Sequence, residues 1–424
     1  MKRKKFAMVL SICMAGILAA GCAGNLNLGN SGDDTQNAPE ETEGLDDSGD
    51  VNLHIWISEN ETTFIENVTQ SFIQEHASEA NITITWEEMA AGECRSNLLG
   101  DILNGPDVYT TTDGDLTTIV AGGGASPVMN QDEVYQANLE SASEAMMVND
   151  TMYGYPFTAD NGYFLYYNKA YLSEDDIKSW DRILDVAAQN GKKVDMDWSS
   201  GWYIYSFFGQ TGLSVGLNED GITNFCDWNS TENAIKGVDV AQSLYNIGTH
   251  PGFENTGNWN EGFADGSVIA CVSGVWDAAV MQETLGANYG ASMLPTYTCA
   301  GQQVQMACYF GYKMLGVNPY SEHLEWAHRL AEYMTNEENQ MLHFEISGQG
   351  PSNAKAAESD VVNEAPAIKA VIQQSEYSEL QRLGGNFWDP TTELGTIMST
   401  GNPEGRDFQE IMDTLVEGIT APTT

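Results

Sequence analysis

A tryptophan beside an aspartate, Trp276-Asp277, follows an apolar run that has the composition of a buried strand. The run, residues 268–272, is rich in β-branched and small apolar residues and is closed by Gly274. Open α/β sheets present ligand-binding groups on the loops that follow their strands. An indole stacks on apolar ligand faces and a carboxylate accepts hydrogen bonds, so this pair suits ligand binding. The alternative is that Trp276 only fills a core, where large aromatic side chains mostly lie.

Other aromatic side chains stand in segments that suggest a cleft. Trp388 lies in a polar, glycine-flanked stretch (residues 384–395) that we expect to be a loop, and Trp202 stands beside Tyr203 in an aromatic segment. The chain holds 10 Trp and 18 Tyr, more than a core usually needs, so we expect some of them at a surface or cleft. No Walker loop, GxGxxG, GxSxG or zinc-type cysteine motif occurs, and we expect neither metal nor cofactor.

The charge balance limits the class of ligand. The 424 residues carry 61 acidic and 17 basic side chains, a formal net charge of −44. This balance excludes nucleic acid, anionic lipid surfaces and acidic polysaccharides as electrostatic partners, and it fits a neutral or cationic ligand. The length predicts two or three domains, or two lobes that share a cleft.

The N-terminus has the parts of an export signal. A basic stretch precedes a short apolar run that ends in Leu-Ala-Ala-Gly-Cys at residues 18–22. Small residues before a cysteine resemble a bacterial lipoprotein signal, which implies removal of residues 1–21 and lipid modification of Cys22. Residues 22–50 are acidic and free of aromatic side chains, so we expect a disordered tether on the outer face of the cell membrane. An uncleaved anchor is the alternative.

Five cysteines follow the signal, an odd number without CxxC spacing, and their disulfide status is left open. Cys271 lies in the apolar run before Trp276 and is expected to pack as a small hydrophobe. Cys299 and Cys308 are close enough in sequence to close a short hairpin, but nothing else favours that pairing. The other two are Cys94 and Cys226.

The apolar pattern predicts alternating strands and helices. Strands at 51–57, 81–87 and 108–110 alternate with helices at 62–75 and 94–103. This βαβαβ order predicts a parallel sheet with helices on both faces. Crossing or buried strands are expected at 152–168 and 308–318, and further helices at 232–247, 322–335, 337–346, 365–374 and 407–419.

Seven fragments together point to one protein family. They are IWISENE, LNGPDVY, YGYPFTADNGYFLYYNK, EGFADGSVIACVSGVW, NYGASMLP, EYMTNEENQ and NFWDPTTELG. In this order and spacing they resemble the bacterial extracellular solute-binding proteins of sugar ABC transporters, especially the maltose/maltodextrin-binding branch. The resemblance covers most of residues 51–420. It implies an α/β, periplasmic-binding-protein-like fold with two discontinuous lobes around a hinge, residues 51–157 plus 312–357 and residues 158–311 plus 358–424.

The resemblance also implies that a sugar is held between aromatic rings and polar side chains. Trp276 and Trp388 match two stacking tryptophans of the family. Trp202, with Tyr203 beside it, matches an aromatic position opposite them. Pyranose rings have apolar C–H faces that stack on such rings. Two further candidates for the walls are Tyr309 and Phe310.

Polar positions carry over with some departures. Thr111 stands where the family has a Trp, the loop after the third strand lacks the Arg of an Asp-Arg pair, and Thr392 replaces another Arg. Asp277 and Asp389 could be sugar ligands or helix N-caps. The polar candidates are Glu59, Asn60 and Glu61 after the first strand, Thr111, Thr112, Asp113 and Asp115 after the third, Asp160 or Asn161 at the hinge, and Asp277 and Asp389 beside the tryptophans.

The expected function is binding without catalysis. We expect a monomeric lipoprotein that binds a neutral oligosaccharide, best matched by a maltooligosaccharide or other α-glucan fragment. It would deliver this ligand to the permease subunits of an ABC importer. Xylo- or galactooligosaccharides and polyamines are the alternative ligands. A glycoside hydrolase would need two carboxylates about 5–10 Å apart, but with 61 acidic residues such a pair is uninformative in sequence.

Overall fold

The computed structural model describes residues 49–58, 61–218 and 220–422. The expected signal at 1–21, Cys22, nearly all of the tether, and Glu59 and Asn60 lie outside the described residues. None of the helices in the described part combines the length and apolar character needed to cross a membrane.

The first sheet is built from the N-terminal βαβαβ unit and two strands from later in the chain. β1 pairs in parallel with both β2 and β3, so the predicted parallel arrangement is confirmed for these three strands. β17 is antiparallel to both β3 and β6, which makes the complete sheet mixed. In spatial order the strands are β2 (Asn81–Glu88), β1 (Asp50–Ile57), β3 (Val108–Thr112), β17 (Lys313–Val317) and β6 (Tyr155–Thr158).

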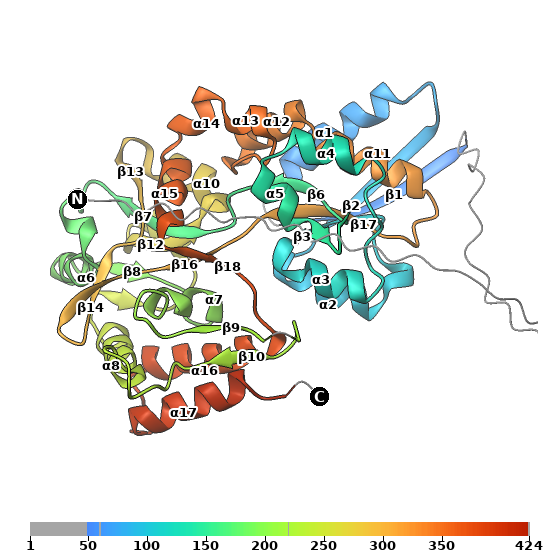
Figure 1. The fold of residues 1–424 in the computed structure, drawn as a ribbon. Coiled ribbons are helices and arrows are strands. Elements are labelled where there is room, and N and C mark those ends of the chain that lie inside the picture. Colours follow the sequence, from blue (N-terminus) through green and yellow to red (C-terminus); the bar gives the residue numbers. More distant parts are fainter. Residues whose placement is uncertain (1–48, 59–60, 219, 423–424) are drawn as a thin grey trace, which may run out of the picture. The chain divides into compact units, whose positions relative to one another are not determined.

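Helices cover both faces of this sheet, as predicted, because alternate residues of β1 point to opposite sides. Leu53 and Ile55 join the core beneath α1 and α11, whereas Trp56 joins a smaller core beneath α2 and α3. Figure 1 shows the two pairs of helices on opposite sides of the sheet. Their bounds are α1 (Thr62–Glu75), α2 (Ala91–Gly100), α3 (Asp113–Ala121) and α11 (Leu324–Met334).

The second sheet has β12 at its centre. Every residue of β12 is buried, including Cys271, so the predicted buried strand is confirmed. β8 runs parallel to β12 on one side, and β7 runs antiparallel to it on the other. In spatial order the strands are β11 (Phe253–Glu254), β8 (Lys193–Asp195), β12 (Val268–Gly274), β7 (Tyr163–Asn168) and β13 (Tyr289–Ser292).

Strands of the two sheets are joined at two places along the chain, and a third passage follows α12 (Glu337–Ser347), since α15 (Pro366–Gln374) packs in the core of the second sheet; this confirms the two-lobed α/β fold with discontinuous lobes. The single strand predicted at 152–168 is two strands, β6 and β7, one in each sheet. They separate because the residues between them bond elsewhere: the Ala159 N–H donates to the Gly350 carbonyl and the Asn161 N–H to the Gly311 carbonyl. The strand predicted at 308–318 is likewise divided into β16 (Cys308–Phe310) and β17. β18 (Ser378–Leu380) pairs with β16 beside this second passage.

Several predicted helices are confirmed, although some begin later or earlier than expected. The region predicted as helical from 232 begins its helix only at Gly237, and the segment after the third strand, expected to be a loop, starts a helix at Asp113. Two carboxylates in the first turn of α3 favour that start, since they face the positive end of the helix dipole. The other confirmed helices are α8 (Gly237–Gly248), α12 (Glu337–Ser347), α15 (Pro366–Gln374) and α17 (Phe408–Ile419), and two further helices are α6 (Trp180–Gln189) and α10 (Ala278–Leu285).

The prediction of a loop at 384–395 is wrong for most of that segment, because the helix α16 (Trp388–Ser399) begins there. Pro390 lies in the first turn of α16, where it removes no helical hydrogen bond. Gly395 faces the backbone of Trp198, and a Cβ atom there would stand 2.0 Å from the Trp198 carbonyl oxygen. The glycine therefore marks a close approach of the helix to a neighbouring segment rather than a loop.

The described cysteines are free thiols, so the hairpin disulfide between Cys299 and Cys308 does not form in this structure. The remaining short elements are α4 (Gln131–Ala137), α5 (Glu140–Ala145), β4 (Met147–Val148), β5 (Thr151–Met152), α7 (Gly201–Ile204), β9 (Val215–Leu217), β10 (Asn224–Cys226), α9 (Trp259–Asp265), β14 (Thr296–Cys299), β15 (Gln302–Gln305), α13 (Ala354–Ala357) and α14 (Asp360–Glu364).

Gly395→Ala should destabilise the protein, because the new methyl group meets backbone that cannot turn aside. The expected cost is about 1–3 kcal/mol in the free energy of unfolding, typical of overpacking. Gly100→Ala, at the end of α2 with nothing within 4 Å, is the matched control and should not lower stability. Guanidinium unfolding measures both, and equal midpoints for Gly395→Ala and the parent protein would contradict the close approach.

Candidate ligand-binding site

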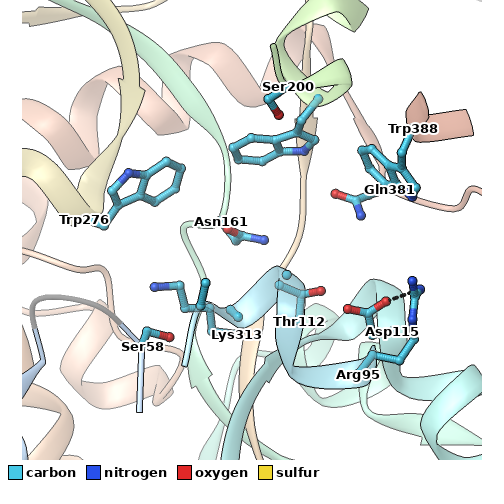
Figure 2. A pocket seen from close by; sticks show the side chains of 14 residues that line it. Ser58, Arg95, Thr112, Asp115, Asn161, Ser200, Trp276, Lys313, Gln381 and Trp388 are labelled. Atoms are coloured by element: carbon cyan, nitrogen blue, oxygen red, sulfur yellow. Dashed lines mark hydrogen bonds and ion pairs between the residues drawn. The ribbon is translucent and has the colours of Figure 1, made fainter. Parts of the chain in front are cut away.

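A cavity of about 440 Å³ is lined by strand ends of the first sheet and by helices and turns that pack on both sheets. Figure 2 shows Trp276 and Trp388 on one side, Ser58, Lys313, Thr112, Asp115 and Arg95 on the other, and Asn161 between them. The lining residues are Ser58, Ala90, Ala91, Gly92, Arg95, Thr112, Asp115, Asn161, Ser200, Trp202, Trp276, Lys313, Gln381 and Trp388.

Trp276 is placed by the end of β12. It stands in a 3-10 turn, Val275–Asp277, directly after Gly274. Its ring folds back over that glycine, where a Cβ atom would stand 2.1 Å from the indole. Only a residue without a side chain therefore leaves room for the ring in this position.

Asp277, beside it, does not line the cavity. Its buried carboxylate accepts hydrogen bonds from the Trp259 indole N–H (2.9 Å), the Asn260 amide (3.1 Å) and the Ser273 hydroxyl (2.5 Å). It makes no side-chain capping bond to α10. Asp277 therefore stands at the N-cap position of α10 without capping it through its side chain, and the carboxylate instead holds the turn that carries Trp276.

Trp202 adjoins Trp276 on the same wall. The two ring centroids are 5.7 Å apart with planes tilted by 33°. Tyr163 supports Trp202 from behind, with ring centroids 4.7 Å apart in an edge-on contact, and its hydroxyl donates to the Trp202 carbonyl at 2.9 Å. Tyr203 is buried against Tyr163 and Trp259 and does not reach the cavity.

Trp388 is carried into the same wall by the contact of α16 with α7. A Cβ atom on Gly201, the first residue of α7, would stand 1.9 Å from the Thr391 hydroxyl, so the two helices touch at this glycine. Thr391 in turn donates to the Phe387 and Trp388 carbonyls at 2.8 Å. The exposed Asp389 lies outside the cavity. Trp202, Trp276 and Trp388 together form what we call the aromatic wall.

An ion pair faces the aromatic wall. The Arg95 guanidinium of α2 donates to the Asp115 carboxylate of α3 at 2.6 Å. Burial raises the pKa of Asp115, and the arginine opposes that rise. The arginine that the loop after the third strand lacks is thus supplied by another element. Thr112, at the end of β3, lines the cavity beside the pair, while Thr111 is buried behind it.

The hinge passage contributes Asn161 to the cavity and turns Asp160 away from it. The buried Asp160 carboxylate accepts the Gly350 N–H. Its burial raises its pKa to about 6, although the Gly350 N–H and the Lys313 ammonium oppose that rise. Of the two residues between which the sequence could not decide, Asn161 is therefore the one that reaches the cavity.

A second buried carboxylate, Glu61, lies under the cavity and not on its surface. It accepts the Ser58 N–H at 3.2 Å and stands 3.9 Å from the Lys313 ammonium and 3.7 Å from the His343 ring. Burial raises the pKa of Glu61, and burial together with Lys313 lowers the pKa of His343 to about 3. His343 is therefore neutral at pH 7.

A third buried carboxylate, Asp113, joins α3 to the second passage between the sheets. It accepts the Tyr312 N–H and an Arg382 N–H, both at 2.8 Å. Arg382 follows Gln381, whose backbone N–H donates to the Phe310 carbonyl at 3.3 Å. Asp113 thus bonds both Tyr312, the residue before β17, and Arg382, in the segment after β18.

The two further wall candidates lie elsewhere. Tyr309 is buried and stacks on Tyr205, with ring centroids 3.9 Å apart and planes 19° from parallel. Phe310 is half-buried against Tyr312 and Gly162. Both rings therefore strengthen the second passage and do not line the cavity.

The cavity brings together part of the set suggested by the sequence. The suggested residues that line it are Trp202, Trp276, Trp388, Asn161, Thr112 and Asp115. Those that do not are Tyr203, Asp160, Glu61, Thr111, Asp113, Asp277, Tyr309, Phe310 and Asp389. The lining residues that the sequence reasoning missed are Ser58, Ala90, Ala91, Gly92, Arg95, Ser200, Lys313 and Gln381.

Two of the missed residues had a signal in the sequence. Arg95 follows the predicted strand at 81–87, and the carboxyl ends of parallel strands meet at one edge of a sheet. Lys313 opens an otherwise apolar strand, where a charged residue calls for a partner or a function.

Comparisons with known proteins agree with this architecture. The family model of bacterial extracellular solute-binding proteins matches residues 71–370. The chain belongs to this family. A galactooligosaccharide-binding protein of Bacillus subtilis (strain 168) is 24% identical over 367 residues, covering 83% of this chain and 85% of that protein. A maltodextrin-binding protein of the same organism is 22% identical over 352 residues, covering 76% and 78%.

Solved structures share the fold of this solute-binding protein. The maltose/maltodextrin-binding domain from Bdellovibrio bacteriovorus bound to maltotriose matches with a TM-score of 0.73 at 19% identity, covering 87% of this chain and 98% of that one. A maltodextrin-binding protein from L. casei BL23, solved without ligand, matches with a TM-score of 0.71 at 22% identity, covering 88% and 99%.

Asp160→Asn in this solute-binding protein should change how stability depends on pH. The folded-state pKa of Asp160 is raised to about 6, above the ordinary value of about 3.9. Its stabilising contribution is therefore complete below pH ~4 and is lost as pH rises through ~6. Asparagine has no such loss, so the variant should gain about 1–3 kcal/mol relative to the parent protein between pH 4 and pH 7.5.

Urea unfolding at the two pH values measures this gain. Asp132→Asn, an exposed position in α4, is the control and should show no pH-dependent difference. A difference between Asp160→Asn and the parent protein that is the same at both pH values would contradict the raised pKa.

Proposed function

We propose that this solute-binding protein binds a neutral oligosaccharide and delivers it to the permease of an ABC importer. The observation that carries the proposal is the aromatic wall, which faces polar side chains across the cavity. Indole rings stack on the C–H faces of pyranoses, while amide, hydroxyl and charged groups bond their hydroxyls. The cavity volume of about 440 Å³ lies in the range typical of small-molecule sites.

Within the class of neutral oligosaccharides, two kinds of sugar are candidates for the ligand. A maltooligosaccharide or other α-glucan fragment is our first candidate, supported by the named maltodextrin-binding relative and by neighbours solved with maltotriose. A galactooligosaccharide is the second, because a relative with that name matches over 83% of the chain. Both have the stacking faces that the aromatic wall fits.

The charged residues that line the cavity disfavour both polyamine binding and glycoside hydrolysis. Among the described lining residues Asp115 is the only carboxylate, and Arg95 already neutralises it, so a polyamine would find no unpaired anion there. The same single carboxylate does not supply the pair that glycoside hydrolysis uses. Binding without catalysis therefore accounts best for the residues in the cavity.

The proposal includes attachment to the cell surface. Export and lipid modification at Cys22 would hold a monomeric binding protein on the outer face of the membrane, near the permease. This part rests on the signal-like residues 18–22 and on the acidic tether that follows, both read from the sequence. No contact with nucleic acid is proposed, since the net charge of −44 opposes it.

The double variant Trp276→Ala, Trp388→Ala should abolish sugar binding and leave folding nearly unchanged. Both indoles are only partly buried, so their loss removes a ligand surface more than a core. Each truncation of a central aromatic contact commonly costs about 2 kcal/mol or more, so together the Kd should rise by about 1,000-fold. Titration calorimetry with maltotriose, maltotetraose, galactotriose and xylotriose measures the Kd.

Tyr320→Ala, at an exposed aromatic residue outside the cavity, is the control and should bind like the parent protein. Absence of binding to every sugar of the panel by the parent protein would reject the proposed function. A large drop in melting temperature for the double variant would mean that the indoles serve the core.

A further inference from the structure

Lys313 places a positive charge at the cavity where the strand pattern calls for an apolar residue. It begins β17, whose five residues are all buried, and its side chain is only 8% exposed. Burying an ammonium is costly unless it is paired and hydrogen-bonded. Its presence at a wall of the cavity therefore calls for a function as well as for partners.

The partners of Lys313 fix its position and leave part of it unused. The ammonium donates to the Gln349 side-chain oxygen at 2.9 Å, and Glu61 stands 3.9 Å away, too far for a hydrogen bond but close enough to compensate charge. A lysine ammonium has three N–H donors, and the bond to Gln349 uses one. Gln349 and Glu61 do not line the cavity, so a ligand there meets the ammonium and not its partners.

Trp276 lies across the cavity from this ammonium. The Lys313 nitrogen is 6.0 Å from the centroid of the Trp276 ring, at the outer limit for a direct attraction between the two. A sugar ring stacked on the indole at about 3.5–4.0 Å would bring hydroxyls at its edge within hydrogen-bond reach of the ammonium. Because 6.0 Å is too narrow for a ring to lie between the two groups, the sugar ring would stack on the part of the indole beside the ammonium, with its edge toward Lys313; Figure 2 shows both side chains close together at the cavity.

The other charged groups of the lining differ from Lys313. Arg95 and Asp115 bond each other at 2.6 Å, so each already has its counter-charge at the cavity surface. Lys313 has its counter-charge behind it, in Glu61, which is 2% exposed. A ligand that approaches Trp276 therefore meets a hydrogen-bond donor with positive charge.

We propose that Lys313 determines specificity in this cavity: its ammonium donates to hydroxyl oxygens of the sugar ring stacked on Trp276, and its charge excludes amine ligands. The proposal rests on the proposed oligosaccharide function and assigns a role to a residue that the aromatic wall alone would not require. Lys313 acts by direct contact with the ligand, while Gln349 and Glu61 act by holding it in place.

Lys313→Met is the direct test, because it removes the donor and the charge but keeps an unbranched side chain. Calorimetry with maltotriose and galactotriose should show a Kd raised about 10–100-fold for whichever sugar the parent protein binds. Spermidine, which the parent protein should not bind, should gain measurable affinity. Lys355→Met, at a lysine whose side chain is 79% exposed, is the matched control and should leave every Kd unchanged.

A second variant separates a loss of sugar contact from a loss of folding. Lys313→Met leaves Glu61 without its partner, so the double variant Glu61→Gln, Lys313→Met removes both charges and should fold while showing the same loss of sugar affinity. A sugar Kd equal to that of the parent protein in either folded variant overturns the role of Lys313 and leaves the proposed function intact. Binding of spermidine but of no sugar by the parent protein overturns both.

Discussion

Buried carboxylates that accept hydrogen bonds hold the frame of the cavity. A carboxylate is costly to remove from water unless donors surround it. Asp113 accepts the Tyr312 N–H and Asp160 accepts the Gly350 N–H, so each fixes backbone at one of the passages between the sheets. Asp277 accepts three donors at the turn that carries Trp276. These two passages and the position of Trp276 thus all depend on hydrogen bonds accepted by a buried carboxylate.

The aromatic wall depends equally on places where a side chain is missing. Gly274 leaves room for the Trp276 ring, and Gly201 lets α7 touch α16 so that Trp202 and Trp388 reach one surface. The tryptophans supply the contact area and the glycines supply the positions. A binding surface of this kind therefore depends on each tryptophan together with a glycine that leaves room for it, so a side chain added at the glycine would displace the tryptophan.

The sequence predicted the architecture well because strong periodic patterns and the order of elements carry it. The parallel strands, the buried strand before Trp276 and the helices at 62–75 and 407–419 follow from local apolar spacing. The loop predicted around Trp388 failed because proline and glycine were taken as breaks, whereas Pro390 occupies a first turn and Gly395 a close contact. Those roles depend on neighbours distant in sequence.

The site was harder to predict for a related physical reason. An aspartate that binds a ligand and one that anchors backbone have the same side chain and often the same place after a strand. Asp115 reaches the cavity while Asp113, two residues earlier on the same helix, points to the hinge. Arg95 comes from a different helix, so its pairing with Asp115 exists only once α2 and α3 lie together.

The bond between Asp113 and Arg382 has a mechanical consequence. Asp113 begins a helix of the first sheet's lobe, and Arg382 belongs to the segment that follows β18, which pairs with the second passage. A rotation of one lobe against the other must either turn about this bond or break it. The bond joins the helix that carries Asp115 to the segment that carries Gln381, so a rotation that breaks it would separate these two parts of the cavity lining.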